Sequence, residues 1–194
     1  MSFKNNEEGF TGLEAAIVLI AFVVVAAVFS YVVLGAGFFT TQKSQEVVHT
    51  GVQQASSTLE IVGNVYGTGT SAGVTFVNFS VALAPGGTAV DFAKVVMTYS
   101  DATHLVTLQQ ASGTYPVAGG EPAQGNWTVS QVQNGNTDKL LESGEQFVIS
   151  ANPLGANAIG VNQKFTIEIK PSVGAAFGVT RSTPGGLSNV NILY

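Results

Sequence analysis

The side chains most able to do chemistry are few in this 194-residue chain and lie far apart in the sequence. There is no cysteine, which excludes disulfides, thiolate nucleophiles and cysteine-based zinc sites. The two histidines, His49 and His104, fall on different predicted elements, so a shared site is not expected. We interpret His49 as lying on the polar face of a helix. We expect His104 to hydrogen-bond with Asp101 in a hairpin rather than to bind a metal.

The densest group of carboxylates consists of Asp138, Glu142 and Glu145. Calcium takes oxygen ligands, so this group is a weak hypothesis for a calcium site. A solvated loop is the simpler interpretation. The other carboxylates show no paired spacing typical of acid–base catalysis, and no nucleophile has an adjacent base. The sequence therefore predicts a protein that is not an enzyme and that needs no cofactor.

The charge content restricts the class of protein further. Charged residues make up 10% of the chain, against roughly 25% in an average soluble domain, while hydrophobic residues make up 45%. The net charge is -5, and the seven Lys and Arg residues are too scattered to build the basic patch that nucleic acids require. We therefore predict no nucleic-acid partner. The composition indicates either a membrane segment or a surface that other subunits bury.

The element that dominates the chain is an apolar segment near its beginning. No charged residue occurs between Glu14 and Lys43, and residues 15–39 are almost entirely apolar. As a helix this run would be roughly 38 Å long, which is enough to cross a hydrocarbon core of about 30 Å. It exceeds the apolar region of a secretory signal peptide, which has about 7–15 residues. A helix that is apolar on every side must be buried in lipid or in protein.

Beyond Lys43, apolar residues recur at three- and four-residue spacing with polar residues between them, which predicts an amphipathic extension. They are Val47, Val48, Val52, Ala55, Leu59 and Val62. We expect one helix over residues 10–62, roughly 80 Å long. We interpret the glycine-rich residues 63–73 as a hinge that ends it. This stretch has no phosphate-loop lysine, so a nucleotide site is not predicted.

Residues 74–194 have the pattern of an all-β domain. Short runs rich in β-branched and aromatic residues alternate with turn clusters at the spacing of a sandwich or barrel. The predicted strands are 74–83, 90–99, 104–108, 126–132, 147–149, 165–169, 177–180 and 190–193. Asn134-Gly135 predicts a tight hairpin turn. The expected fold class is α+β, a lollipop-shaped chain with a long N-terminal helix followed by an immunoglobulin-like sandwich.

The residues before the apolar run form a short polar leader that ends in Gly9 and is followed by Phe10-Thr11-Gly12-Leu13-Glu14. This arrangement resembles type IV pilin-like precursors, in which a membrane peptidase cuts after a glycine. The resemblance implies that a prepilin-type peptidase cuts between Gly9 and Phe10 and removes residues 1–9.

The cut would leave a positive amine on Phe10, four residues from the Glu14 carboxylate and on the same helix face. A lone carboxylate in an apolar core is costly, so Glu14 needs a partner, either its own amine or that of a neighbouring subunit. Alternatively, Glu14 lies at a membrane interface. Gly12, Gly35 and Gly37 would permit close approach of neighbouring helices.

Within this class the sequence resembles the archaellins, the subunits of the archaeal motility filament. The resemblance covers about the first 67 residues, and a fainter likeness lies within residues 165–184. The stretches that carry it are residues 11–14, 33–39, 42–44, 61–67, 165–171 and 181–184. The resemblance implies a membrane-embedded precursor that becomes an extracellular filament, either a homopolymer or a mixture with paralogous subunits. Its helices would form the core and its β-domains the shell.

Two sequons, Asn78-Phe79-Ser80 and Asn126-Trp127-Thr128, are predicted acceptors of N-linked glycans if the protein is exported. Two other functions stay open at this point. One is an archaeal adhesion pilin that shares the helix but serves attachment. The other is a membrane-anchored binding protein with a permanent helix and a β-sandwich.

Overall fold

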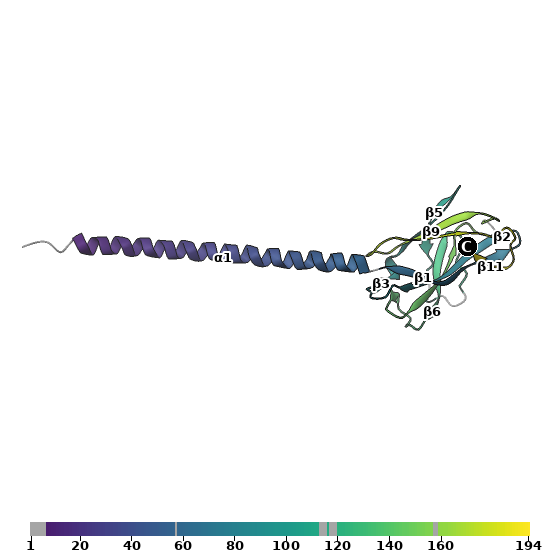
Figure 1. Cartoon of the computed structure of the whole chain (residues 1–194), viewed down its shortest axis with the longest axis horizontal. Helices are drawn as coiled ribbons and strands as arrows, with labels where there is room; N and C mark the ends of the chain where they lie inside the picture. The colour runs from purple at the N-terminus through teal and green to yellow at the C-terminus, as the bar shows by residue number, and fades with distance from the viewer. Residues whose placement is uncertain (1–6, 57, 113–115, 117–119, 157–158) are drawn as a thin grey trace, which may run out of the picture. The chain divides into compact units, whose positions relative to one another are not determined.

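The structure is a computed structural model that describes residues 7–56, 58–112, 116, 120–156 and 159–194. The chain divides into two compact units, Met1–Thr50 and Gly51–Tyr194. The helix α1 spans Glu7–Ser56, and Figure 1 shows it as one uninterrupted helix. The predicted fold class, a long N-terminal helix followed by an all-β domain, is confirmed.

Helix α1 is continuous because nothing in its sequence interrupts the backbone ladder. It contains no proline, and three of its threonine side chains hydrogen-bond back to its own carbonyls. Thr40 Oγ1 donates to the Ala36 carbonyl at 2.8 Å, and Thr41 Oγ1 donates to the Gly37 carbonyl at 2.9 Å. These polar groups are therefore satisfied within a largely apolar helix.

The predicted helix end at Val62 is wrong, because the chain enters strand β1 (Leu59–Thr70) three residues after α1 ends. The Thr58 carbonyl already accepts a hydrogen bond from Ala84 N at 2.9 Å, and Leu59 pairs with Leu83 in the sheet. Leu59 is buried and Ile61 packs against the same core. Leu59 and Ile61 alternate with the exposed Glu60, so the same residues fit the two-residue period of a strand as well as the period of a helix. Their burial in the β-domain stabilises the strand.

The predicted glycine-rich hinge at residues 63–73 is also wrong. Most of it belongs to β1, which pairs with β2 (Gly73–Leu83) as an antiparallel hairpin. A Cβ on Gly69 would lie 2.9 Å from the backbone N of Thr75, and a Cβ on Gly67 would lie 3.0 Å from the Val74 methyl carbons. Gly63 has a φ of +79° at the register shift between Val62 and Tyr66. These glycines permit close strand packing and a bulge, not a hinge.

The remaining elements of the β-domain follow in chain order. They are β3 (Val90–Asp91), the 3-10 helix η1 (Phe92–Lys94), β4 (Val96–Asp101), β5 (Leu105–Gln110), β6 (Asn126–Gln133), β7 (Leu140–Leu141), β8 (Gln146–Asn152), β9 (Lys164–Lys170), β10 (Phe177–Ser182) and β11 (Val190–Leu193).

Nine strands form a sheet in the order β10-β9-β4-β5-β6-β8-β2-β1-β11. One half consists of β10, β9, β4 and β5, and the other of β6, β8, β2, β1 and β11. The two halves meet through a short parallel pairing of β5 with β6, where Gln109 lies opposite Asn126. The two end strands, β10 and β11, also meet: Ser182 N donates to the Tyr194 carbonyl at 2.6 Å, and Tyr194 N donates back to the Ser182 carbonyl at 3.2 Å. The β-domain is therefore a sandwich whose halves are tied along both sides.

The core between the two halves is apolar and aromatic. Phe92 makes edge-on contacts with Trp127, with ring centroids 6.3 Å apart, and with Phe147 at 5.1 Å. Tyr99 stacks on Phe165 at 5.7 Å. All five rings are buried. The domain therefore has an aromatic core of its own that needs no side chain from another chain.

Two local predictions in the β-domain are wrong. The predicted strand 90–99 is interrupted by η1, because Asp91 Oδ1 accepts a hydrogen bond from Ala93 N and caps a helical turn. The Asn134-Gly135 hairpin does not form, since β6 pairs with β8 across a connection that contains residues 134–145. Asn134 does have a positive φ of 55°, so the turn signal is local and does not set the strand pairing.

Candidate functional site

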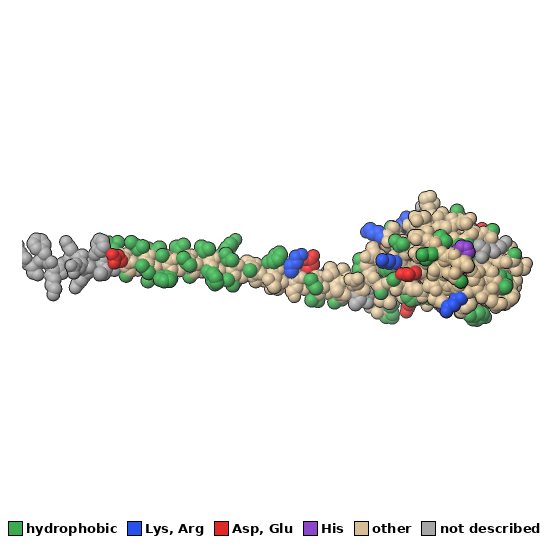
Figure 2. Space-filling model, turned by 90° about the horizontal axis from the view of Figure 1, so that it is seen from above, with side chains coloured by type: hydrophobic (Ala, Val, Ile, Leu, Met, Phe, Trp, Pro, Cys, Tyr) green, Lys and Arg blue, Asp and Glu red, His purple; other side chains and the backbone are tan. Residues whose placement is uncertain are grey.

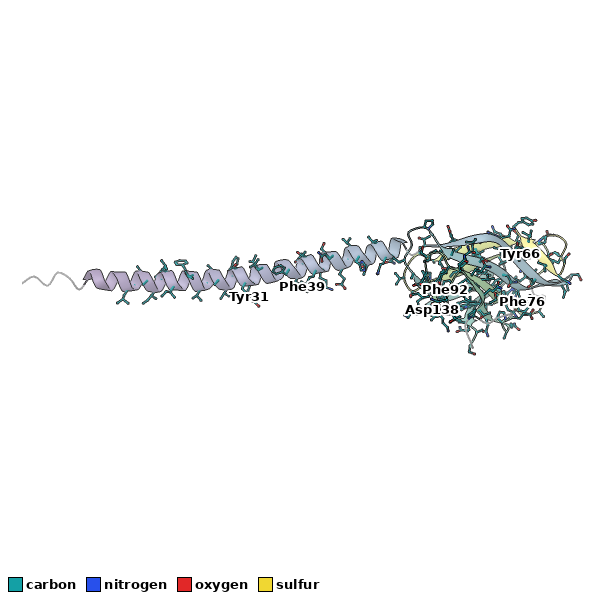
Figure 3. All side chains as sticks on the ribbon, turned by 90° about the horizontal axis from the view of Figure 1, so that it is seen from below. Tyr31, Phe39, Tyr66, Phe76, Phe92 and Asp138 are labelled. Carbon is teal, nitrogen blue, oxygen red and sulfur yellow. The ribbon has the colours of Figure 1, made fainter. Side chains whose placement is uncertain are left out.

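The surface of α1 is the largest apolar feature of the described chain. Every residue from 12 to 52 is exposed in the isolated chain. Figure 2 shows hydrophobic side chains along the helix between its acidic end and a pair of opposite charges, and Figure 3 shows Tyr31 and Phe39 pointing away from the helix axis. By length and composition, Gly12–Gln54 is sufficient to cross a membrane. So large an exposed apolar surface marks contact with lipid or protein.

Glu14 lies at the edge of this apolar surface and is exposed. Beside it is a shallow hollow on one helix face, lined by Ala15, Val18, Leu19, Phe22 and Val23. The carboxylate therefore borders an apolar surface suited to a second helix. Gly9 and Phe10, the predicted cleavage residues, lie within the first turns of α1. The cut between them and the pairing of Glu14 with an amine stay predictions.

The glycines predicted to allow close helix approach have no packing partner within the described chain. A Cβ added to Gly12, Gly35 or Gly37 would meet nothing within 4 Å. Glycine inside a helix costs about 1 kcal/mol relative to alanine. Within one chain no contact compensates for this loss of helix stability. Close contact with another helix, which a side chain would block, would compensate for it.

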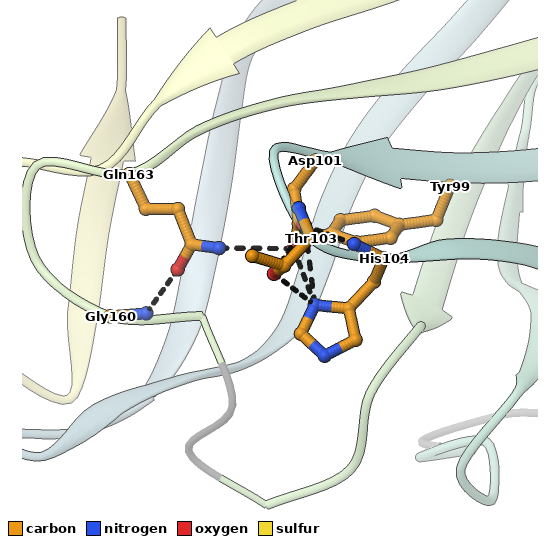
Figure 4. A network of polar contacts seen from close by, with 6 residues as sticks. All are labelled: Tyr99, Asp101, Thr103, His104, Gly160 and Gln163. Carbon is orange, nitrogen blue, oxygen red and sulfur yellow. Dashed lines mark hydrogen bonds and ion pairs between the residues drawn. The ribbon is translucent and has the colours of Figure 1, made fainter.

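In the β-domain, Asp101 is the centre of a polar network (Figure 4). Its Oδ1 accepts hydrogen bonds from Thr103 N at 2.7 Å and from His104 N at 2.6 Å. Its Oδ2 accepts from the Tyr99 hydroxyl at 2.9 Å and from Gln163 Nε2 at 3.0 Å. The Asp101 side chain is fully shielded from solvent. It thus ties the β4–β5 hairpin to the segment before β9.

The surroundings of Asp101 determine its ionisation. Burial alone would raise the pKa of Asp101, but the hydrogen bonds from Thr103, His104 and Tyr99 outweigh it and hold the pKa well below its ordinary value. Burial raises the pKa of the Tyr99 phenol, and the hydrogen bond to Asp101 adds to the effect. Asp101 is therefore a charged acceptor that stabilises the hairpin.

The predicted hydrogen bond between His104 and Asp101 is confirmed. His104 Nδ1 lies 3.2 Å from both carboxylate oxygens of Asp101. Thr103 Oγ1 contacts the same nitrogen at 2.8 Å. A catalytic triad needs the nucleophile and the acid on opposite ring nitrogens, so this arrangement cannot relay a proton from Thr103 to Asp101.

The acidic cluster near β7 organises its own loop. Glu145 is buried, and its two oxygens accept hydrogen bonds from Asn136 N at 3.1 Å and Glu142 N at 3.0 Å. Asp138 Oδ1 accepts from Leu140 N at 2.8 Å. Among the described residues, no group of three or more His, Cys, Asp or Glu side chains is placed to hold a metal ion.

Both sequons lie on strands. Asn78 is half-buried in β2, and its Nδ2 donates to Thr68 Oγ1 at 3.1 Å. Asn126 begins β6 and is also half-buried, and the hydroxyl-bearing Thr128 of its sequon is buried. Glycosylation at these two positions stays a prediction.

Sequence reasoning missed Gln163 as a partner of Asp101. The two residues are 62 positions apart, and no local motif connects them. Only the pairing of β4 with β9 brings them together, with Asp101 opposite Phe165. A contact set by long-range strand pairing leaves no signal in sequence spacing.

A largely apolar, exposed helix joined to a β-domain with a core of its own defines a subunit that buries its helix outside its own chain. The sequence model of the archaeal-type flagellin family matches residues 9–181. The chain belongs to this family, whose members are structural filament subunits and not enzymes.

Individual relatives agree with the family assignment. The chain is 43% identical to "Probable flagellin 1" of Archaeoglobus fulgidus, with 100% of this chain and 98% of that protein covered. It matches the archaeal flagellum of Methanospirillum hungatei strain JF1 with a TM-score of 0.72 and 36% identity, covering 94% of this chain and 99% of the other. A crystal structure of a flagellin from Methanocaldococcus jannaschii shares the fold, with a TM-score of 0.59, 14% identity, and 70% and 95% of the two chains covered.

Replacing the central carboxylate tests the Asp101 network. Asp101→Asn keeps the side-chain volume but removes a charged acceptor, so we expect a loss of roughly 2–3 kcal/mol in the free energy of unfolding at pH 7. The single tryptophan, Trp127, is fully buried and reports unfolding of the detergent-solubilised chain in urea.

The same experiment has a pH signature. The pKa of Asp101 is lower in the folded chain than its value of about 3.9 in the unfolded chain, so the Asp101 charge stabilises the fold above pH 3.9. This stabilisation is lost progressively as the pH falls from about 3.9 towards the pKa of the folded chain. The gap between wild type and Asp101→Asn should therefore narrow by about 1 kcal/mol between pH 5 and pH 3. Asp138→Asn, at an exposed acceptor of a single backbone hydrogen bond, is the control. Equal stabilities of the two variants at pH 7 would contradict the proposed role of Asp101.

Proposed function

We propose that this chain polymerises into the archaeal motility filament through lateral packing of α1, with the β-domains forming the outer shell. The observation that carries the proposal is the exposure of every residue from 12 to 52, most of them apolar, in a chain whose β-domain is already complete. An apolar surface of that extent must be covered, and identical helices can cover one another.

Before assembly, lipid would cover the helix. We propose a membrane-embedded precursor held by α1, with residues 1–9 removed by a prepilin-type peptidase. Gly12–Gln54 has the length and composition for the membrane stage. The filament itself would lie outside the cell. A contact that joins different surfaces of successive copies and does not close into a ring produces an open helical polymer.

Transfer of α1 from lipid to a bundle of helices changes hydrophobic burial little, since both surroundings are apolar. Other interactions must then favour the polymer. Close approach at Gly12, Gly35 and Gly37 would improve van der Waals packing, and a pair between Glu14 and the Phe10 amine would remove the cost of a lone charge. The amine exists only after the cut, so cleavage would make assembly favourable.

The processing step makes a direct prediction. Protein from purified filaments should begin at Phe10 when its N-terminus is sequenced. Gly9→Val should leave the uncleaved chain in the membrane fraction and reduce filaments to background by electron microscopy. The matched control is Gly186→Val in the exposed loop between β10 and β11, where an added Cβ meets nothing within 4 Å, and it should leave processing unchanged. Filaments composed of chains that begin at Met1 would contradict the proposed cleavage. Motility has its own test: cells that swim normally after deletion of the gene would contradict a role of this chain in the motility filament.

The Glu14 pair makes a second prediction. Glu14→Gln removes the charge but keeps the shape, which leaves the Phe10 amine unpaired in the core. Breaking such a pair costs about 3 kcal/mol, equal to roughly a 100-fold rise in the concentration needed for assembly. The control is Glu46→Gln, whose carboxylate pairs with Lys43 on the helix at 2.6 Å and lies beyond the apolar stretch. Sedimentation of filaments measures both, and equal yields would exclude a role for the Glu14 charge.

A further inference from the structure

The outer face of one half of the sandwich is almost free of charge. It is formed by the outward residues of β6, β8, β2, β1 and β11, and we call it the uncharged face. Strand register places Gln133 beside Gln146 in one row, and Asn78, Tyr66 and Ile192 in another. Figure 3 labels Tyr66 and Phe76, which both belong to it. Among the described strand positions on this face, Glu60 is the one charged residue, with Glu121 at the border of the face.

The outer face of the other half differs. On β9, buried Phe165, Ile167 and Ile169 alternate with outward Lys164, Glu168 and Lys170. The β-domain therefore carries charge on one outer face and amide, hydroxyl and apolar side chains on the other. Charged residues keep surfaces soluble and separate, so a broad face without them is suited to burial.

Large apolar side chains extend along one rim of the uncharged face. Val190 is 62% exposed, Ile192 41%, Tyr194 77% and Tyr66 40%. Their neighbours Asn191 and Leu193 point inward and are buried, so the strand alternation itself directs this row outward. A contiguous exposed apolar row of this kind typically marks a contact with another protein.

The uncharged face is also hollowed. One depression of about 380 Å³ is bordered by Asn64, Tyr66, Asn78, Gln131, Gln133 and Gln146. A second, of about 280 Å³, lies between Phe76 and Glu121. Concave surfaces lined by amides and an aromatic ring can accept projecting side chains of a partner.

We propose that the uncharged face is the contact surface between β-domains in the filament, and that a second copy of this chain covers it with its lysine-bearing face. This inference rests on the filament function proposed above. The acidic residues of this face, Glu60 and Glu121, are opposite in sign to Lys164 and Lys170, which flank Glu168 on the opposite face. Two different faces meet, so the contact repeats from copy to copy without closing.

Charge also argues for a second copy over other occupants. Residues 51–194 contain eight acidic and five basic residues, so identical domains repel each other unless they meet through neutral or complementary surfaces. An anionic lipid surface or a nucleic acid would need basic residues, and this face has none among its described strand positions.

The absence of cysteine allows a direct test. Gln133→Cys and Ile192→Cys each place one thiol on the uncharged face. Thr137→Cys places one in the exposed loop between β6 and β7, outside the strands of both contact faces, as the control. Each variant is exposed to a maleimide-linked polyethylene glycol, first as filaments confirmed by electron microscopy and then after dispersal in detergent. We expect labelling at residues 133 and 192 to be at least about tenfold slower in filaments, and labelling at residue 137 to change little.

Equal labelling of intact filaments and dispersed chains at residues 133 and 192 would overturn the inference but leave the filament function standing. Failure of the wild-type chain to form filaments would overturn both. A glycan on Asn78 is the competing cover for this face. A glycan stays attached in detergent and would slow labelling in filaments and dispersed chains alike. If labelling at residue 133 is slow in both states and becomes fast in both in the Asn78→Gln background, the glycan and not a second copy covers the face.

Discussion

The constraint on which the structure depends is that α1 cannot bury its own surface. Its residues from 12 to 52 are exposed, and most are apolar. Contact of this surface with water is unfavourable, so the helix needs an apolar surrounding. In the proposed pathway, lipid satisfies this requirement for the precursor, and neighbouring copies of α1 satisfy it in the polymer. Because both are apolar, the change from one to the other is nearly balanced, and small local interactions near Glu14 and the helix glycines can decide its direction.

Unlike α1, the β-domain buries its core within one chain, so it can fold before a polymer forms. Its aromatic core around Phe92, Trp127 and Phe147 is complete within one chain. Backbone pairing of Ser182 with Tyr194 and the Asp101 network hold together segments that are distant in sequence. A rigid domain of this kind presents fixed outer faces. Fixed faces are what a repeating contact between copies needs.

Much of the organisation could be predicted from the sequence. The charge-free stretch between Glu14 and Lys43 predicts the helix because an apolar run of that length is typical of a helix buried in lipid or protein, and most strands follow from their alternation. The errors at the end of the helix and in the glycine-rich segment share one cause. Leu59 fits both a helical and a strand period, and Gly67 and Gly69 resemble a linker until the close approach of β2 is known. Pairing across the sheet determined these positions, as it determined the contact between Asp101 and Gln163. Local spacing contains no record of such pairing.

Helical reconstruction of the purified native filament by electron cryo-microscopy tests the central claim most directly. We predict a core in which α1 of each copy is surrounded by α1 of its neighbours, with Glu14 within hydrogen-bonding distance of an N-terminal amine and the β-domains outside. A polymer held together by the β-domains alone, with α1 exposed to solvent or embedded in lipid, would contradict it.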